Sequence, residues 1–264
     1  MTVPWTELRN DLEAAVFRFD TLIGDVDRNR QVDGSDWSIE EAACHVMTAF
    51  DRWSAMSEGS TVDVGHGREF TPRMSEINER EIEAIGRGWD AEAFGASVTR
   101  WIERCRDPNS AMLPYGPPEL ECSHAHSSAI LLGELVIHGY DIARTVDAPW
   151  PITRREAIAI FEGALVLLPL VYDGSATEGR TFTMDVRLRG RSGGLGLHCT
   201  PSPLTINNGS PPNAAVHISA DPVGWILIGY GRRSQLWGAY TGRVRVWGRK
   251  PWLALRFGRL FPSP

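Results

Sequence analysis

The spacing of apolar residues changes part-way along this chain, and that change limits the possible folds more than any other feature. In the first half, apolar residues recur every three or four positions, as on one face of a helix. After about residue 180 they alternate with polar residues, the period of a half-buried strand. Pro149 and Pro151 stand between the two patterns, and neither can continue a helix. We therefore predict two domains, an all-α four-helix bundle over 1–150 and an α+β domain over 151–264.

Capping and breaking residues divide the two halves into elements. Ser38 and Glu41 form a capping-box pattern that starts a helix near Ile39. The other helices are expected at 5–22, 74–88, 91–104, 127–146 and 153–172, with shorter helical pieces at 221–230 and 249–260. Strands are expected at 182–188, 195–197, 215–218 and 243–246. The proline-rich residues 107–123 are expected to form an extended loop.

Three side chains on two of the predicted helices form a candidate metal site. Glu134 and His138 are four residues apart in an apolar helical pattern, so they share a face. His45 lies on a second apolar face, and facing helices of a bundle can direct such side chains at one ion. Two imidazoles and one carboxylate make a zinc ligand set that leaves a coordination position open. A buried, ionised glutamate among apolar neighbours would be costly without such a cation.

Other residues near this pattern have open roles. Asp141, one turn after His138, is expected either to orient a ligand imidazole or to pair with Arg144 at the surface. His126 in the SHAHSS segment is a candidate for substrate contact, metal binding or a surface role. A lone histidine such as His45 can also be an ordinary hydrogen-bonded core residue. Cys44 is not expected to share a metal with His45, because adjacent helix positions diverge by about 100°.

Composition excludes several classes of function. The net charge of −6 argues against nucleic acid as a partner, because phosphate contacts need clustered Lys and Arg. No basic segment precedes an apolar run at the start, and the longest apolar run, 163–171, is too short to span a bilayer. The four scattered cysteines predict reduced, packed thiols, so we expect a cytoplasmic protein. Motifs of nucleotide binding and of serine hydrolases are absent from the sequence.

Four segments of the chain resemble the mycothiol-dependent maleylpyruvate isomerase family, within the wider DinB-like metalloprotein group. They are WSIEEAACH (37–45), GELVIHGYDIAR (133–144), DPVGWILIGYGRR (221–233) and GRVRVWG (242–248). The resemblance implies a DinB-like metal-binding helical bundle followed by a sterol-carrier-like domain. It implies that His45, Glu134 and His138 hold zinc or another divalent metal, with mycothiol as cosubstrate. It also implies a catalytic arginine from the second domain, Arg232, with Arg233 as the second candidate.

The function expected from this resemblance is a thiol-dependent isomerase or S-transferase acting on a small electrophilic, acidic substrate. Arg232 would hold the substrate carboxylate by a bidentate contact. Two alternatives remain at this point. One is a metal-dependent hydrolase on the same bundle, which uses water in place of the thiol. The other is a non-catalytic protein that binds a small molecule or lipid in its second domain. The oligomeric state is left open.

Overall fold

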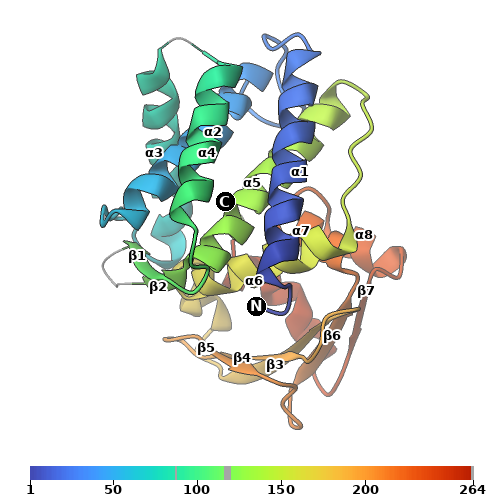
Figure 1. The fold of residues 1–264 in the computed structure, drawn as a ribbon. Coiled ribbons are helices and arrows are strands. Elements are labelled where there is room, and N and C mark those ends of the chain that lie inside the picture. The colour runs from blue at the N-terminus through green and yellow to red at the C-terminus, as the bar shows by residue number, and fades with distance from the viewer. Residues whose placement is uncertain (87, 116–119, 263–264) are drawn as a thin grey trace.

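The computed structural model describes residues 1–86, 88–115 and 120–262. The helices of its first half and its main sheet occupy opposite sides of the molecule (Figure 1). The helices of the first half are α1 (Trp5–Gly24), α2 (Ile39–Ser57), α3 (Phe70–Ile85), α4 (Ala91–Arg104) and α5 (His124–Thr145). The helix α6 (Arg154–Val171) follows and lies between this group and the sheet.

The helix α5 is the centre of the helical region. It packs against α1, α2 and α6, and α2 also packs against α3 and α4. The side chains of Leu131, Leu132 and Leu135 on α5 are fully buried. The helix α2 begins at Ile39 because Ser38 and Glu41 cap it reciprocally, as the sequence predicted. A fixed start and a packed inner face together determine which way each side chain of α2 points.

The C-terminal region is built on a five-stranded sheet with the order β5-β4-β3-β6-β7. Its strands are β3 (Phe182–Leu188), β4 (Leu195–Cys199), β5 (Thr205–Asn208), β6 (Val216–Ala220) and β7 (Val244–Trp247). The strands β3 and β6 pair in parallel, and the other pairs are antiparallel. The remaining elements are α7 (Pro222–Gly229), α8 (Gln235–Tyr240), the 3₁₀ helix η3 (Pro251–Arg256) and α9 (Phe257–Leu260). The apolar period-2 residues of β3, such as Met184 and Val186, are buried.

The expected fold class is confirmed, because a helical N-terminal region is followed by a region of mixed helices and strands. The expectation of an extended loop over 107–123 was wrong. Two short strands, β1 (Ala111–Tyr115) and β2 (Leu120–Ser123), pair there in antiparallel fashion, while 116–119 lie outside the described residues. Four prolines in this segment masked the strand signal, since proline cannot donate to a ladder. The domain boundary near Trp150 stays a prediction.

Smaller differences concern short elements. The structure adds α8 and β5, which the sequence did not indicate, and divides the helical piece expected at 249–260 into η3 and α9. The four cysteines are free and buried, as expected. Among the described residues, no helix combines the length and the apolar character that crossing a membrane requires.

Candidate metal centre

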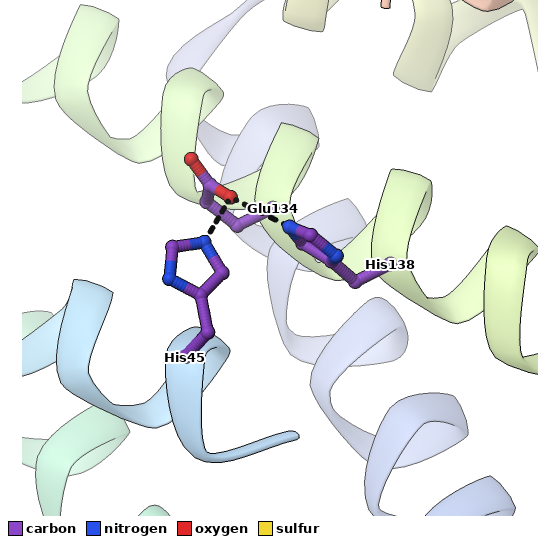
Figure 2. Close-up of side chains that lie close together, drawn as sticks. All are labelled: His45, Glu134 and His138. Atoms are coloured by element: carbon purple, nitrogen blue, oxygen red, sulfur yellow. Dashed lines mark hydrogen bonds and ion pairs between the residues drawn. The ribbon is translucent and has the colours of Figure 1, made fainter. Parts of the chain in front are cut away.

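His45, Glu134 and His138 come together between α2 and α5 (Figure 2). His45 lies in the second turn of α2, and the other two lie on successive turns of α5. The close packing of α2 on α5 brings the imidazole of His45 to the carboxylate of Glu134, across 89 positions in the chain. The prediction that these three side chains converge is therefore met by the geometry.

The distances suit one shared cation. The carboxylate atom Oε2 of Glu134 lies 3.2 Å from Nε2 of His45 and 3.4 Å from Nε2 of His138. One ligand atom from each residue lies within 4.8 Å of the others. A tetrahedral zinc ion with bonds of about 2.0–2.2 Å holds its ligand atoms roughly 3.3–3.6 Å apart. The donor set of two nitrogens and one oxygen thus fits such an ion with modest adjustment.

The protonation states also suit a cation. Burial lowers the pKa of His45 to about 4, so its imidazole is neutral at physiological pH and can offer a lone pair. Burial alone would raise the pKa of Glu134. Hydrogen bonds with His138 and His45 outweigh it and hold that pKa well below its usual range. A neutral imidazole and an ionised carboxylate are the forms that bind a metal.

Packing rather than a second hydrogen bond orients His45. Its outer nitrogen, Nδ1, is buried and has no hydrogen-bond partner among the described residues. The ring of Trp37 lies 5.0 Å from the His45 ring and 6.1 Å from the His138 ring, measured between centroids. The rings of His45 and His138 meet edge to face at 4.8 Å. Trp37 therefore backs both imidazoles and restricts their rotation.

The three residues face a cavity of about 660 Å³, which we call the metal cavity. Most of its wall comes from the helical region, including Trp37, Arg52 and Tyr115. The C-terminal region contributes the segment Tyr230–Arg232, which follows α7. Both regions of the molecule thus contribute to the same site.

Arg232 reaches this cavity, but its guanidinium already has protein partners. Its Nε and one terminal nitrogen donate to the carboxylate of Asp141, at 2.9 and 2.6 Å, and the other terminal nitrogen donates to the carbonyl of Tyr230. Asp141 thus pairs with Arg232, a partner that neither sequence interpretation had named. The expected surface pair between Asp141 and Arg144 does not form among the described contacts. A guanidinium has five N–H groups, so Arg232 keeps donors for a ligand.

Arg52 is a cavity residue that the sequence reading missed. Its side chain is only 6% exposed, and one terminal nitrogen donates to Asn78 and to Glu81. Its Nε is buried and has no partner within the described part of the chain. A partly unsatisfied, buried guanidinium is a candidate anion-binding group. The signal was present, since Arg52 follows His45 by seven positions and two helical turns place it on the same face.

Two tyrosines add hydroxyl groups to the same cavity. Tyr115 extends from β1 and packs edge to face against Trp53, at 5.8 Å between ring centroids. Tyr230 reaches α5, where a Cβ added at Gly133 would lie 3.2 Å from its hydroxyl oxygen. Burial raises the pKa of both phenols, so each stays protonated and can donate a hydrogen bond.

The other sequence candidates lie apart from this cavity. His126 is absent from the described residues that line it, and its Nδ1 is 2.8 Å from the Ser123 hydroxyl at the start of α5. The ring of His124 packs edge to face on Trp101. Burial raises the pKa of Cys44 to about 11, so its thiol stays protonated. We assign none of these three to the metal cavity.

No model of a known protein family matches this sequence, and no curated protein matches it either. Solved structures do match. The mycothiol-dependent maleylpyruvate isomerase matches 88% of this chain and 91% of its own, at 14% sequence identity and a TM-score of 0.46. A histidine-to-alanine variant of that isomerase matches 92% of this chain and 93% of its own, at 14% identity and a TM-score of 0.48.

Two further matches cover part of the chain. The ubiquinone synthesis protein UbiJ-SCP2 matches 34% of this chain and 78% of its own, at 14% identity and a TM-score of 0.27. The inverting sec-alkylsulfatase Pisa1 from Pseudomonas sp. matches 53% of this chain at 18% identity and a TM-score of 0.36, and the match spans only 25% of that enzyme. The two matches to the isomerase thus cover most of this chain, at low sequence identity.

Proposed function

We propose that this protein is a metal-dependent enzyme that uses a small thiol, of which mycothiol is the first candidate, either to isomerise a small acidic electrophile or to form a thioether with it as an S-transferase. The observation that carries the proposal is the convergence of His45, Glu134 and His138 in one cavity. Residues of both the helical region and the C-terminal region line that cavity. The thiol dependence is supported by the sequence resemblance in 37–45 and 133–144.

His45, Glu134 and His138 would hold the ion, zinc being the first candidate for two nitrogens and one oxygen. A bound divalent cation lowers the pKa of a thiol that coordinates it, which favours the nucleophilic thiolate. The neutral state of His45 and the ionised state of Glu134 are those in which imidazole and carboxylate bind a divalent cation. Trp37 holds both imidazoles in place by packing.

The remaining residues would bind and orient the substrate. Arg232 and Arg52 both line the metal cavity and would offer N–H donors to a substrate carboxylate. When the thiolate sulfur bonds to one carbon of a double bond conjugated to a carbonyl group, the electron pair of that double bond moves to the carbonyl oxygen, and the former double bond becomes single and can rotate. Breaking the carbon–sulfur bond then restores the double bond with the other geometry and returns the thiol. A transferase stops after addition, and Tyr115 or Tyr230 could donate the proton that the carbon then needs.

A first experiment combines elemental analysis with turnover. Purified protein is expected to contain about one divalent metal ion per chain. Turnover of cis-configured unsaturated acids is expected to need an added thiol, with mycothiol, glutathione and cysteine compared. Turnover without thiol would replace the proposal by the hydrolase alternative. Protein without metal and without turnover would overturn it.

A further inference from the structure

A second cavity, lined mainly by apolar side chains, adjoins the metal cavity. It has a volume of about 140 Å³ and lies between α6, the inner face of the sheet, α7 and the C-terminal residues. None of the described residues that line it is charged. We call it the apolar cavity, and Ala164, Val186 and Trp225 mark three of its walls. An apolar cavity of roughly 150 Å³ stays dry and accepts a molecule of about the size of benzene.

The side chains of α6 do not fill the apolar cavity. Four apolar residues of α6 that line this cavity remain partly exposed, although α6 lies between the helical region and the sheet: Ala164, Leu165, Leu167 and Leu168. Apolar side chains in the middle of a molecule are normally covered, since burial of apolar surface drives folding. A ligand that covers this stretch would recover that stabilisation.

The two cavities share part of their walls. Phe70 at the start of α3, Leu167 on α6 and Tyr230 after α7 line both of them. These three side chains therefore stand at the boundary between the polar site and the apolar space. A ligand that extends from one cavity into the other has to pass these three side chains.

We propose that the natural substrate carries an unbranched aliphatic or small aromatic tail, whose polar head lies at the metal centre and whose tail passes Phe70, Leu167 and Tyr230 into the apolar cavity. This inference rests on the proposed function, because the head group is placed by the metal. It names a substrate class, an amphipathic acid or thiol adduct, larger than the compact acid expected from the sequence.

Straight-chain hydroxamates test the proposal, because the head binds divalent metals and only the chain length varies. Zinc-loaded protein is titrated with acetohydroxamate through decanohydroxamate, and the cobalt-loaded protein reports by its visible spectrum whether the head reaches the ion. Affinity is expected to rise about fourfold per methylene once the chain passes the shared wall, and to level off when the cavity is full. The cobalt spectrum is expected to change over the same concentration range.

A filled cavity provides the matched control. Ala164 lines the apolar cavity but not the metal cavity. With Ala164→Leu, affinity is expected to level off at a shorter chain, and with Ala164→Phe it is expected not to rise with chain length. Acetohydroxamate should bind both variants as it binds the wild type. Ala14→Phe, at an exposed site on α1, is expected to change neither the dependence of affinity on chain length nor the binding of acetohydroxamate. Metal content and thermal unfolding establish that each variant is folded.

The outcomes separate the two proposals. If the protein takes up metal but hydroxamate affinity does not change with chain length, the tail site is overturned and the proposed metal enzyme is not. The same holds if affinity rises with chain length equally in the wild type and in Ala164→Phe. A rise in affinity without any change in the cobalt spectrum also overturns it, because the chain then binds away from the ion. Wild-type protein that takes up no metal overturns both.

Discussion

The two walls of the metal cavity are built in different ways. On one wall, His45, Glu134 and His138 stand on α2 and α5, two long helices joined by a fully buried core. On the other wall, Arg232 stands in a turn between two short helices, after Gly231 with a φ of 75°. Its side chain is held by the ion pair with Asp141.

This difference predicts that metal binding and substrate binding are separable. Regular helices fix the metal ligands through many backbone contacts, so changes in the opposite wall should not disturb them. A turn held by one ion pair can shift when a ligand competes for the guanidinium. The metal should therefore depend on one region alone, while recognition of the substrate depends on both.

The largest expected effect is on the helical wall. Glu134→Gln removes the charged ligand and leaves a neutral amide between two imidazoles, so we expect metal affinity to fall more than about a hundredfold. Elemental analysis after dialysis measures this. Glu103→Gln, on the exposed side of α4, is the control and should keep its metal. Stoichiometric zinc in Glu134→Gln would contradict the assignment.

A second prediction concerns the connection between the two regions. Glu162 on α6 accepts hydrogen bonds from Thr2 and from Arg191, which lies between β3 and β4. Burial would raise the pKa of Glu162, but these bonds lower it below its ordinary value. Its stabilisation is therefore present above the ordinary glutamate pKa and is lost as the pH falls through the folded-state pKa.

We expect Glu162→Gln to lower the free energy of unfolding by about 2 kcal/mol at pH 7, because it leaves Arg191 buried without a charge partner. The difference from the wild type should shrink as the pH falls from 6 to 3. Urea unfolding at each pH measures it. A difference that stays constant over this range would show that the carboxylate charge is not the cause.

A smaller effect is expected at the ion pair between Asp141 on α5 and Arg232 in the C-terminal region. Asp141→Asn weakens the pair with Arg232, which is partly exposed, so stability should fall by about 1 kcal/mol or less. Metal content should not change. The freed guanidinium should bind an anionic substrate analogue more tightly, by up to about tenfold, as a titration would measure. Loss of metal in this variant would mean that the two walls are not independent.

The smallest effect is expected at Arg144, which lines the metal cavity from an exposed position on α5. Its guanidinium lies over the ring of Tyr140, 5.7 Å from the centroid. Arg144→Gln should leave metal content unchanged and stability within about 0.5 kcal/mol of the wild type. A marked fall in substrate affinity here would point to Arg144 rather than Arg52 or Arg232 as the carboxylate partner.

The helical wall could be predicted from the sequence because local rules govern it. The capping box at Ser38 sets the start of α2, and helical periodicity places Glu134 and His138 on one face. The same periodicity could have predicted that Arg52 lies on the same face of α2 as His45, two turns later. What periodicity cannot give is the meeting of α2 with α5, which depends on packing between distant segments.

The C-terminal wall was harder to predict because its contacts are not local. The pair of Arg232 with Asp141 joins residues 91 positions apart, and no pattern around either residue indicates it. The short elements α8 and β5 carry too few residues for a clear period. The apolar cavity lies where α6, the sheet and α7 with the C-terminal residues meet. The sequence of α6 alone therefore predicts only that its apolar residues belong to the hydrophobic core.

Gly133 allows close approach between α5 and the residues that pack on it. It directly precedes Glu134, and a methyl group there would press on the Tyr230 hydroxyl at 3.2 Å and on Ile160 at 3.3 Å. A side chain at position 133 would meet both neighbours closer than ordinary van der Waals contact, so they would have to shift by a few tenths of an ångström. The missing side chain thus lets Tyr230, which lines the metal cavity from the C-terminal region, lie directly against the helix that carries Glu134 and His138.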